Sequence, residues 1–147
     1  MAEGDAVIYN YYKYALMNAI YDLQNGGDTI QVVLVSGYSP DVDSHTVLSD
    51  VSAYEYSSGL GYTEGGATLA NQATSQDNTN NRGEFDGDDI TWSNLGPLSP
   101  ATPSHAIMVD VSSAGSPLMI AWELGTTPTN GGDYTLEWHT NGISTIS

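Results

Sequence analysis

The densest group of potential metal ligands in the sequence is the acidic stretch Glu84-Phe85-Asp86-Gly87-Asp88-Asp89. Closely spaced carboxylates around a glycine suit a hard cation such as calcium, which takes oxygen ligands. The stretch lacks the ligand spacing of an EF-hand loop, and residues that alternate along a strand would place Asp86 and Asp89 on opposite faces. We therefore predict a solvated acidic turn and no cofactor, with a structural calcium ion as the alternative.

A second candidate is Asp41-Val42-Asp43-Ser44-His45, where two carboxylates and an imidazole lie close together. Such a trio could bind a cation or carry out acid–base chemistry. Ser39-Pro40 comes directly before it and favours a loop in which backbone N–H groups donate to aspartate side chains. We interpret the segment as such a loop.

Patterns typical of catalysis are missing from the sequence. A serine hydrolase needs a positioned histidine, an orienting carboxylate and an oxyanion hole, and no Gly-x-Ser-x-Gly turn is found. His45, His105 and His139 lack metal-ligand spacing. The stretch 58–62 has two glycines but not the lysine of a phosphate-binding loop, and carboxylate pairs for glycoside cleavage are defined only in space. We assign no catalytic, cofactor-binding or metal-ligating residue and predict that the protein is not an enzyme.

The charge balance excludes several partners. There are 18 acidic residues against two cations, Lys13 and Arg82, and the formal net charge is −16. Nucleic acids and anionic membranes both require clustered Lys and Arg, so neither is a predicted partner. The acidity is compatible with either a saline habitat or a partner, since net charge governs solubility and association rather than fold.

Length and composition fit a single domain, residues 1–147. We expect the protein to be made in the cytoplasm. The chain has no cysteine, which removes disulfides and thiolate chemistry. Its first residues are acidic where a signal peptide needs a basic start, and its apolar runs are too short to span a membrane. We expect the protein to stay in the cytoplasm or to leave it within an assembly.

Hydrophobic periodicity predicts a mainly β (α+β) fold, an antiparallel β-sandwich or barrel-like domain with one N-terminal α-helix. The helix is expected at about 5–23, capped by Asp5 and stopped by Asn25-Gly26-Gly27, and the β-rich body at about 29–147. Turn residues separate short runs of alternating or β-branched residues. Strands are predicted at 29–35, 51–56, 67–76, 83–92, 105–111, 117–124, 134–138 and 143–146, with 105–124 forming a hairpin.

Aromatic residues concentrate in the predicted helix beyond what one buried stripe requires. Aromatic enrichment with few charges is typical of interface cores, so this helix is the best candidate for a subunit contact. Ordinary packing against the β-layer is the alternative. The tyrosines concerned are Tyr9, Tyr11, Tyr12, Tyr14 and Tyr21.

Four stretches, spread in order over nearly the whole chain, resemble a family of small proteins of tailed bacteriophages. They read Ala-Glu-Gly-Asp-Ala-Val-Ile-Tyr-Asn at the start, then Ile-Gln-Val-Val-Leu-Val-Ser-Gly-Tyr-Ser-Pro at 30–40, Thr-Pro-Ser-His-Ala-Ile-Met at 102–108 and Gly-Gly-Asp-Tyr-Thr-Leu-Glu-Trp at 131–138. The resemblance implies a virion structural protein. Its favoured role is a capsid decoration (cement) protein that binds the major capsid protein on the outer shell and stabilises it.

The resemblance further implies a homo-oligomer, with a trimer favoured, located on the capsid surface of the virion. It supplies no catalytic residues. A tail-fibre, head-fibre or receptor-binding module is the first alternative. A carbohydrate- or calcium-binding β module is the second, and exposure of Trp92, Trp122 or Trp138 along a groove would favour it.

Overall fold

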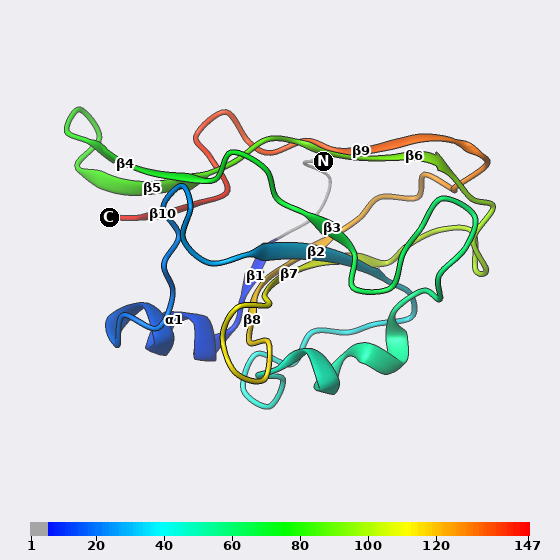
Figure 1. The fold of residues 1–147 in the computed structure, drawn as a ribbon, viewed down its shortest axis with the longest axis horizontal. Helices are drawn as coiled ribbons and strands as arrows, with labels where there is room; N and C mark the ends of the chain where they lie inside the picture. Colours follow the sequence, from blue (N-terminus) through cyan, green and yellow to red (C-terminus); the bar gives the residue numbers. More distant parts are fainter. Residues whose placement is uncertain (1–5) are drawn as a thin grey trace.

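The computed structural model describes residues 6–147 as a mainly β fold in which the strand pairings are antiparallel (Figure 1). This confirms the predicted fold class. The elements, in chain order, are β1 (Ala6–Ile8), α1 (Asn10–Met17), β2 (Ile30–Val35), the short 3-10 turns η1 (Leu48–Asp50) and η2 (Ser52–Tyr54), β3 (Ala67–Thr68), β4 (Ala73–Asp77), β5 (Arg82–Asp86), β6 (Ile90–Leu95), β7 (His105–Asp110), β8 (Leu118–Glu123), β9 (Gly132–Leu136) and β10 (Ser144–Ile146).

The strands form two layers. One layer is a five-stranded sheet with the order β1-β8-β7-β2-β3. The facing layer holds a three-stranded sheet, β10-β5-β4, and a two-stranded sheet, β6-β9, which lie side by side above it in Figure 1. The two layers enclose the larger hydrophobic cluster, as in a β-sandwich.

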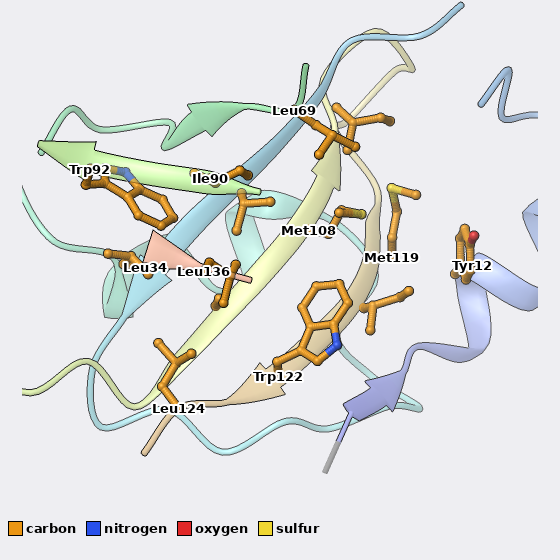
Figure 2. Packing of buried hydrophobic residues seen from close by; sticks show 14 of the residues in the cluster. Tyr12, Leu34, Leu69, Ile90, Trp92, Met108, Met119, Trp122, Leu124 and Leu136 are labelled. Carbon is orange, nitrogen blue, oxygen red and sulfur yellow. The ribbon is translucent and has the colours of Figure 1, made fainter. Parts of the chain in front are cut away.

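The central strands β2, β7 and β8 carry nearly continuous apolar sequence because both of their faces are covered. Leu34, Met108 and Trp122 face the opposite layer, where they pack with residues such as Trp92 and Leu136 (Figure 2). Each of these side chains is at most 6% exposed. A strand buried on both sides has no polar face to display, which explains the sequence pattern.

The outer face of the same sheet carries a second cluster. Val33, Ile107 and Ala121 pack there under the segment that follows β2, which contributes Tyr38 and Val51. All five side chains are at most 5% exposed. This covering segment explains why alternate residues of the central strands are apolar rather than polar.

The predicted helix at 5–23 is wrong at both ends. Residues 6–8 form an edge strand on β8, with Ala6 opposite Trp122 and Ile8 opposite Ile120. The helix begins at Asn10 and ends at Met17, and the predicted cap Asp5 lies outside the described residues. Residues 6–8 pair with the edge of β8. This pairing satisfies backbone N–H and C=O groups by hydrogen bonds, whereas the first turn of a helix leaves its N–H groups without partners.

Three of the predicted strands also need correction. The segment 51–56 forms the 3-10 turn η2, and Val51 just before it is buried in the second cluster. The run 67–76 splits into β3 and β4 at Asn71, whose φ is 51°, and 83–92 splits into β5 and β6 around Gly87. A Cβ at Gly87 would lie 2.8 Å from the Leu69 side chain, so that turn packs closely on the chain.

The remaining predicted strands are confirmed. The segments 29–35, 105–111, 117–124 and 143–146 contain β2, β7, β8 and β10, and the segment 134–138 overlaps β9, which begins and ends two residues earlier. The hairpin at 105–124 forms as predicted, with β7 paired to β8. The last strand does not return along β9; it pairs with β5 in the neighbouring sheet, Ser144 lying opposite Phe85.

Candidate protein-docking surface

Helix α1 has one buried face and one exposed apolar face. Tyr12 and Ala15 are 3% and 0% exposed and turn toward the core. Tyr14 and Met17 are 53% and 82% exposed and point away from it. An apolar side chain that is four-fifths exposed gains nothing from folding, so Met17 is available to a partner.

The tyrosines predicted as a subunit contact divide between core and surface. Tyr9, Tyr12 and Tyr21 are buried, and burial raises the pKa of each phenol. Tyr14 is exposed, and its ring lies 5.7 Å from that of the half-buried Tyr11. The predicted interface therefore narrows to the outer face of α1, and ordinary packing accounts for the other three rings.

An apolar groove of about 200 Å³ opens between α1 and the three-stranded sheet. Tyr12, Leu16 and Leu23 line the helix side. Phe85 and Ile146 line the sheet side, and Ile146 is 65% exposed. Sequence reasoning missed Met17 and Ile146, because an exposed apolar residue has the same pattern as a buried one until the neighbouring layer is placed.

The groove is fixed by contacts across the two walls. The Tyr12 hydroxyl lies 3.4 Å from the Ser144 hydroxyl on β10. The Tyr12 ring packs at 5.2 Å from the ring of Tyr21, which in turn donates a hydrogen bond to the Leu118 carbonyl. These contacts tie α1 to β10 directly and, through the ring of Tyr21, to β8.

Both cations of the chain border this end of the molecule. Lys13 is exposed on α1 and donates to Asn10. Arg82 on β5 is paired with Glu84 at 2.7 Å and with Asp77 at 3.3 Å. Of the two, Lys13 is the cation without a carboxylate partner among the salt bridges of residues 6–147, so α1 presents a free positive charge on a chain with a net charge of −16.

The acidic stretch 84–89 does not form a shared ligand set. The Asp88 carboxylate accepts a hydrogen bond from Asn71, and Asp89 accepts one from the backbone N–H of Trp138. Glu84 is paired with Arg82 on β5. Within residues 6–147, His, Asp and Glu side chains do not gather in groups of three or more that could hold a metal ion.

The segment 41–45 forms the predicted loop. The Asp41 carboxylate accepts hydrogen bonds from the backbone N–H groups of Asp43 and Ser44, and the Ser44 hydrogen bonds lower the pKa of Asp41. His45 Nδ1 lies 2.8 Å from the Tyr38 hydroxyl, which lies 2.6 Å from that of Tyr9. This chain of contacts ties the loop to the start of α1.

The other histidines have local partners of their own. His105 Nδ1 lies 3.1 Å from the Ser104 hydroxyl, and burial lowers the pKa of His105. His139 Nδ1 accepts a hydrogen bond from the backbone N–H of Asn141. Within the described part of the chain, none of the histidines belongs to a group of three or more potential metal ligands.

The tryptophans are core residues and do not line a groove. Trp92 and Trp122 are 5% and 6% exposed in the cluster between the layers (Figure 2). Trp138 is half-buried, with its ring 5.0 Å from that of Trp122 and its indole N–H donating to the Asp88 carbonyl. The tryptophan groove that would have favoured a carbohydrate-binding module is therefore not formed by these three residues.

Neither a known protein family, nor a curated protein, nor a solved structure matches the chain. In residues 6–147, no helix is both long enough and apolar enough to cross a membrane.

Proposed function

We propose that this protein is a virion structural protein of a tailed bacteriophage, a decoration protein that binds the outer capsid surface through the α1 end. The observation that carries the proposal is the exposed apolar face of α1. Tyr14 and Met17 are exposed on one face of α1, and Tyr12 and Leu16 of the same helix line the groove that Ile146 borders, on a molecule with a net charge of −16. Exposed apolar side chains around a groove are typical of docking sites.

The partner in this proposal is the major capsid protein, as the resemblance of the four sequence stretches to tailed-phage proteins implies. A decoration protein needs a rigid body and one adhesive patch rather than an active site. The double-layered core supplies the rigidity, since its central sheet is covered on both faces. A symmetric oligomer, with a trimer favoured, is part of the proposal and would repeat the α1 end around a local axis of the shell.

Co-sedimentation with capsids that lack the protein tests this function. We expect saturable binding in a fixed ratio to shell subunits, with a preference for the expanded mature form over the procapsid. A Tyr14→Ser/Met17→Ser double variant should bind at least about tenfold more weakly, because each buried apolar side chain contributes roughly 1.5–3 kcal/mol. Tyr12 is a poor choice for this test, since its ring is buried and its loss would damage the fold.

The matched control is Leu60→Asn, which removes an exposed apolar side chain at the other end of the molecule. It should leave capsid binding intact. Absence of binding to either capsid form would overturn the decoration role and favour a tail or fibre location. Full affinity of the double variant would instead remove α1 from the contact.

A further inference from the structure

A second hollow, of about 510 Å³, lies between the segment 53–60 and residues 98–99. In Figure 1 the segment after η2, coloured teal to green, runs at the opposite end of the long axis from α1. Two further exposed large hydrophobic side chains, Tyr54 at 40% and Leu60 at 60%, line this hollow. It is therefore separate from the groove proposed for docking.

Leu60 occupies a backbone conformation that its side chain disfavours. Its φ is 54°, in the left-handed region where glycine and asparagine are common and a leucine is rare. Residues 59–62 close a tight turn, with the Gly59 N–H donating to the Tyr62 carbonyl at 2.9 Å. The turn is also held from outside by a hydrogen bond from the Gly96 N–H to the Leu60 carbonyl at 2.8 Å.

Such a turn would be more stable with asparagine, which would also be more soluble. Leucine at this position therefore costs folding energy and exposes an apolar side chain. Strained backbone conformations are often found at ligand-binding sites, so the positive φ of Leu60 at the rim of the hollow points to a ligand.

The wall of the hollow combines an aromatic ring with open polar groups. The Tyr54 ring is held edge-on by the Tyr38 ring at 5.3 Å, and its hydroxyl makes no hydrogen bond within residues 6–147. The hydroxyls of Ser57 and Ser99 likewise have no hydrogen-bond partner in the described chain. Glu55 uses Oε1 to accept from Tyr62 and Gly65, which fixes the carboxylate at the rim.

We infer that this hollow binds a neutral saccharide. Hydroxyls that can both donate and accept match the hydroxyls of a sugar, and the Glu55 carboxylate accepts from them. The Tyr54 ring and the Leu60 side chain cover the apolar face of a pyranose ring. The volume lies within the range of small-molecule sites and accommodates two or three sugar units.

The charges of the site select against acidic sugars. Glu55 lies in the wall, and neither Lys13 nor Arg82 lines the hollow. A uronate or a sugar phosphate would meet both this carboxylate and the negative charge of the whole chain without a compensating cation. The ligand class is therefore a saccharide without acidic groups.

Calorimetric titration of the full chain with neutral trisaccharides tests the inference. The probes are linear trisaccharides of glucose, galactose, mannose and N-acetylglucosamine, with trigalacturonate as the anionic comparison. We expect at least one neutral trisaccharide to bind with a Kd on the order of 1 mM or tighter, and trigalacturonate to bind at least about tenfold more weakly.

Substitutions at Tyr54 and Leu60 locate the site. Tyr54→Ala should weaken binding about tenfold, whereas Tyr54→Phe keeps the ring, loses only the hydroxyl and should weaken binding less. Leu60→Asn should weaken binding several-fold and leave the melting temperature unchanged or higher, because asparagine tolerates the positive φ. Met17→Ser, at the α1 end, is the control and should bind the sugar normally.

Three results would overturn the inference. The first is no heat from any of the four neutral trisaccharides at about ten times the expected Kd. The second is equal binding of trigalacturonate. The third is unchanged affinity in Tyr54→Ala, which would move the sugar elsewhere and leave the rim residues as a protein contact. Capsid binding is measured separately, so failure here would leave the docking proposal intact.

Discussion

Raising the pH should unfold this protein through its buried tyrosines. Tyr9, Tyr21 and Tyr62 are 0%, 9% and 2% exposed, and burial raises the pKa of each far above the ordinary value of 10.0. These phenols stay protonated in the folded protein while the unfolded chain ionises near pH 10. The folded state then binds more protons than the unfolded one, so the free energy of unfolding falls as the pH rises above 10.

The size of the effect follows from the number of buried phenols. Each contributes a loss of about 1.4 kcal/mol per pH unit above 10, so the three together remove about 4 kcal/mol by pH 11. Domains of this size are stable by roughly 5–15 kcal/mol. We therefore expect cooperative unfolding between about pH 11 and 12.

The assay follows tyrosinate absorbance and far-ultraviolet circular dichroism in one alkaline titration. The buried tyrosines Tyr9, Tyr21 and Tyr62 should ionise only together with the loss of β signal. Tyr21→Phe should reduce the loss of stability by about 1.4 kcal/mol per pH unit, at the cost of its hydrogen bond to Leu118. Tyr14→Phe, at an exposed ring, is the control. Ionisation of all ten tyrosines near pH 10 with the β signal intact would refute the reasoning.

Three further predictions follow from charge, packing and one histidine. The melting temperature should rise as salt screens the net charge of −16, and a flat salt titration would contradict this. Leu34→Ala, at a fully buried position of β2, should lower the free energy of unfolding by about 2–5 kcal/mol in urea denaturation; a loss under about 1 kcal/mol would argue against tight packing there. Burial lowers the pKa of His105, so the unfolded chain binds a proton first and stability falls as the pH drops through about 6.5. His105→Gln should flatten that fall in melts at successive pH values, and an unchanged profile would exclude this histidine as its cause.

The fold class could be predicted because periodicity is a local property. The hairpin 105–124 is predicted by two apolar runs and the turn residues between them, and it forms as β7 and β8. The first residue of the helix could not be predicted from local periodicity. Ala6, Val7 and Ile8 suit a helix start as well as an edge strand, and the choice depends on β8, more than a hundred residues away.

The candidate docking surface was half predictable from sequence. Tyrosine enrichment in the sequence predicted a contact surface on α1. In the structure Tyr9 and Tyr12 are buried and cannot contribute to that surface, whereas Tyr14 is exposed and can. Leu16 and Ile146 line one groove because β10 crosses to β5, a pairing that no local pattern encodes. The second hollow has the same origin, since its walls at 53–60 and 98–99 are brought together only by the fold.

The pairing of β1 with β8 has a consequence for how the chain is made. A ribosome adds roughly 5–20 residues per second, so residues 6–8 emerge about ten seconds before residues 120–122 can pair with them. During that interval the tyrosine-rich segment of α1 has neither its sheet nor its groove. Nascent chains that share this delay would aggregate if they met, and the negative charge of the acidic residues that precede β8 opposes such encounters until the last strands arrive.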